Sequence, residues 1–534
     1  MAMAFQDSYD RLLSGCGCEI KKDLISWTNH HLRELLGNSL RQEDSLLCLT
    51  ILHAVFEAAR RSVQRKTICP VIQEVVTTLS QKEIAINLMN LQLVTADKFI
   101  AHSCMATLSC LARCSVDLQQ QFLSTLGKHL DRLTTARDEE KTRCCLLITF
   151  LLTADSRSCH PEETINNSCP ILTVSALQPA NLHDLSTALM PAAVKCLHIM
   201  SPLVQEGEAH DVLYPSLCLW LRLVHRCSSV DILGGPLPQR LIQLSMGEDA
   251  LVANIALEIL DQGLQSVTTE AQFSKVPSWV PSIGQQVIKT VQQGWFDKLC
   301  CRNGFCGFGG THKEPSLKYS EQDVFLPQGD SRMIRRAVLV LLKSSATCLQ
   351  QGLQEGLLEA LQTGFAWLQS KIPTRVGMHA VDHLLHLFLE QDDQLMECLL
   401  SMLLLYLHRP ANWTDFVPIL NPHRMFVKFL GSLGYDHVTL IDFVTSQETC
   451  ALLYIVRYLK LVLSEWDAFV RCHTDGSLDV EDAETHARLD VTMTVLVRMR
   501  IKLEKMSQRR DLLPFSVAPL VRLIEQCEII YENG

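Results

Sequence analysis

Four side chains that prefer soft metal ions lie close together near the middle of the chain. Cys300, Cys301, Cys306 and His312 belong to the stretch CCRNGFCGFGGTH. Tetrahedral zinc sites favour cysteine pairs separated by about two to four residues, and Cys301 and Cys306 meet the upper end of that spacing. No second spaced pair follows them. Unligated loop cysteines are therefore the favoured interpretation, and a zinc-containing domain around Cys300 and His312 is the alternative.

A second group of possible ligands is predicted to lie on one helix. His379, Asp382, His383 and His386 share one helical face, and two histidines four residues apart can bind zinc. However, the glutamate of an HExxH motif is missing between them. The opposite face is apolar, so we expect the histidine face to be a solvated surface.

Two further patterns resemble enzyme sites only in part. The glycine-rich GFCGFGG at 304–310 lacks the Gly-Lys-Ser/Thr ending and the preceding strand of a phosphate-binding loop. Asp436 and His437 are neighbours, but no nucleophile elbow accompanies them, so we expect Asp436 to start a helix by accepting backbone N–H bonds. The sequence therefore predicts a protein that is not an enzyme, with no catalytic, cofactor-binding or metal-binding residue.

A basic stripe is the strongest candidate for a binding surface. Arg498, Lys502, Lys505 and Arg509 fall on one face of a predicted helix, while Val495, Met499 and Met506 can face the core. Such a stripe can bind an acidic partner, an import receptor or a nucleic-acid backbone. The alternative is a solvated face that acidic side chains of nearby helices partly neutralise. No aromatic residues are interleaved with these charges, so a stacking surface for single strands is not indicated.

The composition indicates the elements that must position these residues. The 534 residues are 47% hydrophobic but only 6% aromatic, and long period-two alternations are few. The apolar residues recur at helical spacing, so an all-α protein is expected. The net charge of −10 disfavours a surface built entirely for nucleic acid. Most of the 22 cysteines lie within apolar runs, as expected for small core residues in a reducing compartment.

No targeting or membrane-spanning segment is expected. The opening MAMAFQDSYD has neither the basic nor the apolar region of a secretory signal. The most apolar runs, at 144–152 and 395–407, are shorter than the roughly 20 residues that a bilayer span requires. We expect a soluble intracellular protein without a membrane span.

The spacing of the helices predicts a HEAT/armadillo-like solenoid (an ARM-type superhelix) in two lobes. We expect an N-terminal lobe at 1–269, a loop-rich connection at 270–330 with one helix within 281–299, and a C-terminal lobe at 331–534. Proline, glycine and serine indicate further loops at 154–184, 234–238 and 410–422.

One stretch of the C-terminal lobe, residues 429–466, organises the rest. Its helix after Cys450 is apolar on nearly every side, so we expect other helices to surround it, with Leu453 and Trp466 buried. A narrow polar stripe is the exception, formed by Arg457, Lys460, Ser464 and Asp467. Thr445 or Ser446 is expected to cap the N-terminus of this helix.

The sequence GYDHVTLIDFVTSQETCALLYIVRYLKLVLSEW, at 434–466, resembles the signature region of the Lines family. The C-terminal LLPFSVAPLVRLIEQCE resembles the closing segment of the same family, which we place at 512–531. The resemblance implies a non-enzymatic scaffold or adaptor that modulates Wnt/Wingless-linked signalling and developmental transcription. Its partners would be other proteins, it would need no cofactor, and the resemblance implies residence in the cytoplasm and the nucleus. Nucleic-acid binding through 498–510 is the competing function.

Overall fold

The computed structural model describes residues 42–64, 67–81, 84–95, 97–114, 116–153, 172–173, 182–206, 210–226, 235–269, 279–299, 331–371, 380–414, 416–474, 482–507 and 516–533. These segments consist of helices with short turns, apart from two strands of two residues each. The strands β1 (Thr67–Ile68) and β2 (Leu172–Thr173) pair antiparallel.

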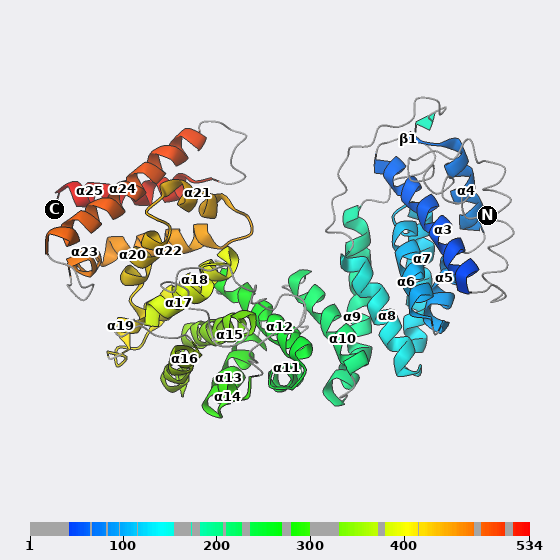
Figure 1. The fold of residues 1–534 in the computed structure, drawn as a ribbon, viewed down its shortest axis with the longest axis horizontal. Helices are drawn as coiled ribbons and strands as arrows, with labels where there is room; N and C mark the ends of the chain where they lie inside the picture. The colour runs from blue at the N-terminus through cyan, green and yellow to red at the C-terminus, as the bar shows by residue number, and fades with distance from the viewer. Residues whose placement is uncertain are drawn as a thin grey trace, which may run out of the picture. The chain divides into compact units, whose positions relative to one another are not determined.

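The chain divides into two compact units, residues 1–227 and residues 228–534. In the first unit α6 packs against α3 and α5, and α8 packs against α9 and α10 (Figure 1). The helices of this unit are α3 (Gln42–Gln64), α4 (Pro70–Gln81), α5 (Ile84–Val94), α6 (Lys98–Leu111), α7 (Val116–Leu133), α8 (Asp138–Thr153), α9 (Leu182–Glu206) and α10 (His210–Arg226).

In the second unit α15 contacts α12, α13 and α18, and the stack continues from α18 to α22 and from α22 to α25 (Figure 1). Its helices are α11 (Leu237–Ser245), α12 (Ala250–Thr269), α13 (Trp279–Gln292), α14 (Trp295–Lys298), α15 (Ser331–Gln350), α16 (Leu357–Lys371), α17 (Ala380–Phe388), α18 (Asp392–His408), α19 (Val417–Leu420), α20 (Pro422–Ser432), α21 (His437–Thr445), α22 (Ala451–Ser464), α23 (Trp466–Thr474), α24 (Asp482–Ser507) and α25 (Ala518–Asn533).

Within each unit, most helices bury their apolar faces on helices that are near to them in the sequence. This is the contact pattern of a stacked helical array, in which each layer packs mainly on its neighbours. The fold is an all-α helical solenoid, and the class predicted from the sequence is confirmed.

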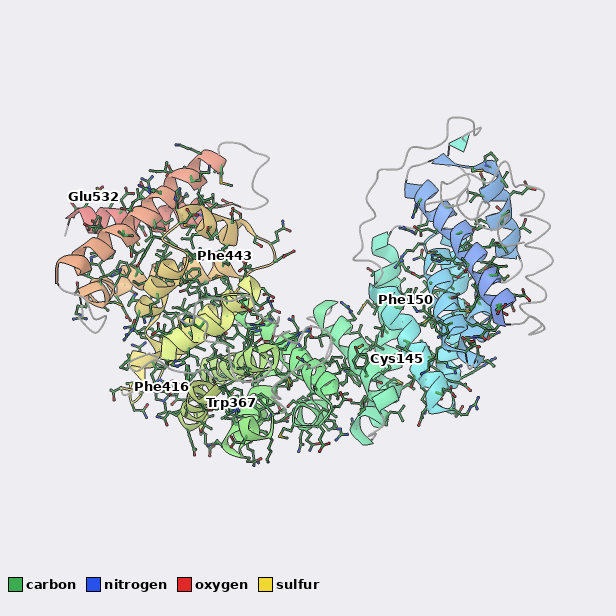
Figure 2. The ribbon with its side chains drawn as sticks, in the orientation of Figure 1. Cys145, Phe150, Trp367, Phe416, Phe443 and Glu532 are labelled. Carbon is green, nitrogen blue, oxygen red and sulfur yellow. The ribbon has the colours of Figure 1, made fainter. Side chains whose placement is uncertain are left out.

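Cysteines contribute to the cores of both units. Cys145 lies on α8, where Figure 2 labels it, and its thiol donates to the Pro215 carbonyl of α10 at 3.3 Å. In the second unit, burial raises the pKa of the Cys348 thiol to about 12. A thiol with such a pKa stays protonated at neutral pH and is a poor nucleophile. These two cysteines therefore act as small apolar core residues, as predicted.

One described helix is long and apolar enough to cross a membrane. Thr187–Gln205 of α9 spans 19 residues with a mean hydropathy of 1.3. The helix contacts α7, α8 and α10, and Lys195 forms an ion pair with Asp131 of α7. The core helix of a packed protein meets the same criterion. The two apolar runs singled out in the sequence lie within α8 and α18.

The boundary between the units differs from the one predicted. The sequence suggested a connecting region at 270–330, whereas the units meet between residues 227 and 228. Helices α12 and α13 precede residue 300, yet both pack against α15, which follows residue 330. Glycine and proline indicate where secondary structure is interrupted, but they do not indicate which helices on the two sides of the interruption pack together. The helix expected within 281–299 is present as α13, followed by α14.

Prolines that the sequence placed in loops instead lie in the first turns of helices. Pro238 lies in the first turn of α11, and Pro422 is the first residue of α20. Proline is tolerated there because the first turn leaves its N–H groups without helical partners. The Asn421 side chain caps α20 by accepting from the backbone N–H groups of His423 and Arg424.

Helix α22 is less enclosed than predicted. Lys460 and Ser464 are exposed and Arg457 is half-buried, which confirms the polar stripe, but Leu453 and Trp466 are also only half-buried. The predicted cap is wrong as well. Thr445 ends α21, Ser446 is the residue after it, and α22 starts at Ala451 without a side-chain cap.

The enclosed helix of the second unit is α15, which is buried continuously from Met333 to Leu349. Its Lys343 side chain is fully buried and donates to Asp261 of α12 at 2.6 Å and to Glu397 of α18 at 2.7 Å. Burial alone would lower the pKa of the Lys343 ammonium, but the two carboxylates raise it above its usual range. One buried charge therefore joins three helices.

Replacing Lys343 by methionine is expected to destabilise the protein by about 3–5 kcal/mol, because two buried carboxylates lose their cation. Urea unfolding followed by circular dichroism measures the effect. The control is Lys289→Met, since Lys289 is exposed on α13 and its replacement should change the free energy of unfolding by less than about 0.5 kcal/mol. Equal stability of the two variants would contradict the assigned role of Lys343.

The same cluster predicts a pH dependence of stability. Burial raises the pKa of Glu397 from 4.5 to about 7, although Lys343 opposes the shift. The folded state therefore holds this proton more tightly than the unfolded state, and the contribution of Glu397 falls as pH rises from about 4.5 to about 7. Glu397→Gln should remove this decline. Between pH 4.5 and 8, the free energy of unfolding of the variant should therefore rise relative to that of the wild type. A difference independent of pH would contradict the assignment.

Candidate partner-binding site

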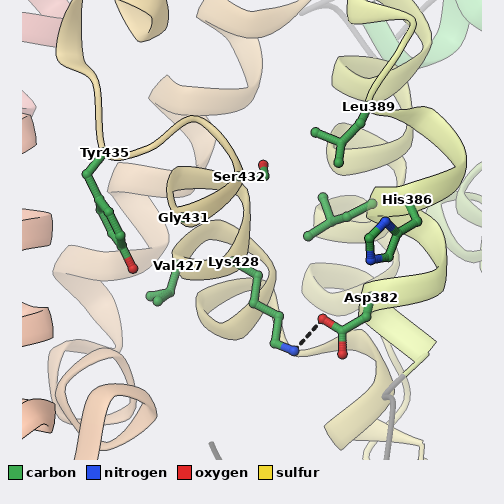
Figure 3. A pocket seen from close by; sticks show the side chains of 9 residues that line it. Asp382, His386, Leu389, Val427, Lys428, Gly431, Ser432 and Tyr435 are labelled. Carbon is green, nitrogen blue, oxygen red and sulfur yellow. Dashed lines mark hydrogen bonds and ion pairs between the residues drawn. The ribbon is translucent and has the colours of Figure 1, made fainter. Parts of the chain in front are cut away.

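A pocket of about 300 Å³ opens between α17 and α20. Leu385 of α17, Leu389 just after the end of that helix and Val427 of α20 supply its apolar surface. Tyr435 lies beyond the end of α20 (Figure 3). The other lining residues are Asp382, His386, Lys428, Gly431 and Ser432. The alternation of apolar and polar side chains along two packed helices produces this mixed lining.

The charged groups of the pocket neutralise each other. Lys428 forms an ion pair with Asp382 across the two helices (Figure 3). Partial burial lowers the pKa of the solvent-accessible His386, although Asp382 opposes the shift, so the neutral imidazole predominates at pH 7. The site therefore presents hydrogen-bonding groups beside an apolar floor, with no excess charge. That arrangement is suited to binding an uncharged group.

A strained turn closes α20 beside the pocket. Gly434 and Tyr435 both adopt left-handed backbone angles, with φ of 63° and 56°. The Tyr435 N–H donates to the Leu430 carbonyl at 2.9 Å and the Gly434 N–H to the Gly431 carbonyl at 3.0 Å. Glycine adopts this conformation freely, but a tyrosine in it is uncommon and costs energy. The turn holds the Tyr435 ring beside Gly431, where an added Cβ would lie 3.5 Å from the hydroxyl oxygen.

Asp436 ends the turn and starts α21, as predicted. Its carboxylate accepts from the backbone N–H groups of Val438 at 3.0 Å and Thr439 at 3.2 Å. The Val438 hydrogen bond is the largest cause of a lowered Asp436 pKa, and the Thr439 hydroxyl adds to it. Nδ1 of His437 lies 3.7 Å from the same carboxylate. The role of Asp436 is thus to position α21.

The predicted histidine face is only partly solvated. His386 is exposed and Asp382 is half-buried, but His383 is fully buried. The expectation of a solvated face was wrong for His383, because α17 contacts α16, α18 and α20 and is apolar around most of its circumference. His379 lies outside the described residues. No group of three His, Cys, Asp or Glu side chains within the described segments could hold a metal ion.

The basic stripe lies on α24, where Arg498, Lys502 and Lys505 are exposed. None of the three forms an ion pair with a described residue, whereas Arg500 beside them pairs with Glu504 and Glu528. Ile501 is 39% exposed on the same face. Val495 and Met499 are buried as predicted, Met506 is half-buried, and Arg509 lies outside the described residues. We refer to Arg498, Ile501, Lys502 and Lys505 as the basic face.

The other sequence candidates fall elsewhere. Cys300, Cys301, Cys306, His312 and the segment GFCGFGG lie outside the described residues. The sequence did not single out the pocket, because its lining comes from two helices and a turn. The Gly-Tyr-Asp triplet was visible, but the left-handed backbone of Tyr435 has no sequence signal of its own.

Residues 265–473 match the family model for the Lines N-terminus. The chain is 31% identical over 244 residues to Protein lines of Drosophila melanogaster, a match that covers 40% of this chain and 28% of the relative. It is 29% identical over 213 residues to Protein Lines homolog 1 of Homo sapiens, covering 35% of this chain and 27% of the relative. The aligned part thus spans less than a third of the length of these two relatives.

Two solved structures show weak similarity. One describes Kap95p binding to RanGDP, with a TM-score of 0.34 and 11% identity over 90% of this chain and 53% of that chain. The other is a circular tandem repeat protein, with a TM-score of 0.20 and 11% identity over 97% of this chain and 91% of that chain.

Replacing Asp436 by alanine should lower the midpoint of thermal unfolding by about 2–4 °C, because α21 loses its cap. Asp442→Ala is the matched control, since Asp442 is exposed on the same helix and lies outside its first turn. Differential scanning calorimetry compares the two variants with wild type. Equal midpoints for the variants would show that Asp436 does not fix the start of α21.

Proposed function

Because this chain is a member of the Lines family, we propose that it is a non-enzymatic scaffold or adaptor that presents helical surfaces to protein partners. The observation that carries the proposal is the basic face of α24. Its three exposed cations have no acidic partner among the described residues, in a chain whose net charge is −10. A cationic surface that no described acidic residue neutralises can attract an acidic ligand.

The occupant that we propose for the basic face is an acidic segment of another protein. Ile501 is exposed among the cations, so a segment that combines carboxylates with an apolar residue would satisfy both features. A nucleic-acid backbone would use the cations but not the isoleucine. The negative net charge of the chain also opposes a polyanion beyond the immediate contact. Nucleic acid is therefore the competing occupant.

Membership of the Lines family supports two more specific proposals, on the process in which the partners act and on the location of the protein in the cell. We propose that the partners belong to Wnt/Wingless-linked control of developmental transcription, and that the protein works in both the cytoplasm and the nucleus. A Wnt-responsive reporter and imaging of the tagged full chain test these two statements. Unchanged reporter output when the chain is removed would contradict the first, and residence in a single compartment would contradict the second.

The double variant Lys502→Glu/Lys505→Glu should lower capture of acidic partners by at least about tenfold, since attraction becomes repulsion at two positions. Proximity labelling in cells measures partner recovery, and fluorescence anisotropy measures binding of a labelled peptide that alternates glutamate and leucine. Lys289→Glu/Lys298→Glu is the matched control, because both lysines are exposed on the same unit and the net charge changes equally. This control should bind like wild type.

Two outcomes would contradict the proposal. Equal losses in both double variants would mean that net charge, rather than the basic face, controls binding. Tight binding of a duplex DNA that weakens steeply between 50 and 200 mM salt, and that the Lys502→Glu/Lys505→Glu variant loses, would favour the nucleic-acid alternative.

A further inference from the structure

The pocket between α17 and α20 has a lining that selects against charged ligands. Lys428 and Asp382 form an ion pair with each other, and the neutral form of the His386 imidazole predominates at pH 7. A ligand that brought a single charge would disturb this pair without finding an opposite charge of its own. Charge complementarity therefore favours an uncharged occupant.

The size and floor of the pocket define that occupant further. Its volume of about 300 Å³ is at the lower end of the range for ligand sites. Leu385, Leu389 and Val427 are the aliphatic side chains of the lining and can contact a buried hydrocarbon group. One large apolar side chain fills such a space, as the central residues of protein interfaces do.

The rim supplies groups that recognise a peptide backbone. The Tyr435 hydroxyl forms no hydrogen bond with a described residue and lies next to Gly431. The Ser432 hydroxyl donates to the Phe429 carbonyl at 2.7 Å, so its oxygen can still accept a hydrogen bond. A peptide group has one donor and one acceptor, and both can be satisfied at these two hydroxyls.

The backbone strain at Tyr435 indicates that the position of its ring matters. A left-handed tyrosine costs energy that glycine or asparagine would avoid. The ring lies next to Gly431, where an added Cβ would be in van der Waals contact with it, 3.5 Å from the hydroxyl oxygen. Strain at the edge of a cavity is consistent with a wall of a binding site that is formed in advance of binding.

We propose that this pocket binds one large aliphatic or aromatic side chain of a partner peptide, with the Tyr435 and Ser432 hydroxyls contacting the adjoining peptide group. The inference deepens the scaffold proposal and rests on it for the class of partner. It does not depend on the basic face. A small metabolite, a second copy of this chain and another segment of the same chain are the competing occupants.

The experiment begins with a library of random twelve-residue peptides, selected on the immobilised full chain. Enriched peptides should share one large apolar residue, and its replacement by alanine should raise Kd at least tenfold. Gly431→Leu should have a similar effect, because the new side chain occupies the pocket and displaces the Tyr435 ring. Tyr435→Phe, which removes only the hydroxyl, should raise Kd about threefold to tenfold.

Gly127→Leu is the matched control. It makes the same substitution on α7 of the other unit, where an added Cβ has no neighbour within 4 Å, and it should leave Kd unchanged. A second measurement does not depend on the folding of any variant. In the wild-type protein, the methyl NMR signals of Leu385, Leu389 and Val427 should shift as the selected peptide is added.

Several results would overturn the inference. They are the absence of any enriched peptide, equal binding to wild type and Gly431→Leu, and unshifted methyl signals at saturation. Enrichment of acidic peptides that only the Lys502→Glu/Lys505→Glu variant fails to bind would also overturn it, while leaving the scaffold proposal intact. Conversely, methyl shifts together with unchanged binding by that double variant would support the pocket.

Discussion

The second unit depends on one ammonium group that is enclosed by helices. Lys343 projects from α15, the most enclosed helix described, and meets carboxylates from α12 and α18. A buried cation is tolerated only when its partners are in place, so the three helices must adopt one register relative to each other. An apolar contact would allow α15 to slide or rotate with less penalty. The cluster therefore provides specificity of packing, which a stack of similar leucine-rich helices otherwise lacks.

The helices packed around Lys343 also support the two candidate surface sites. α18 packs on α15 and contacts α17 and α20, the two helices that form the pocket. The pocket walls thus rest on a helix that the ion cluster helps to fix. The basic face is further along the stack, on α24, which contacts α21, α23 and α25. Rigid helices, rather than long loops, position both sites.

Local chemistry made most of the helices predictable. The α3 helix has acidic residues in its first turn and an arginine in its last, and α4 begins at Pro70, all of which are local features of a helix terminus. Contacts between distant residues were not predictable. In the sequence Lys343 is an ordinary polar residue, and only the structure shows that it contacts Asp261, 82 residues away. The predicted boundary between the lobes differs from the one in the structure for the same reason, because composition indicates breaks in secondary structure but not which helices pack across them. The pocket also required knowing that α17 lies against α20.

The two candidate surfaces share a physical link. Asp436 ends the turn that positions Tyr435 beside the pocket, and it also caps α21, which packs against α24. One short turn therefore sets both the wall of the pocket and the support of the helix that carries the basic face. A partner with an acidic segment and an apolar anchor, joined by a linker of suitable length, can engage both surfaces of the unit. The second contact is then intramolecular, and weak individual contacts combine into a stable complex without any large interface. That is a physical route by which a stacked helical protein can select its partners.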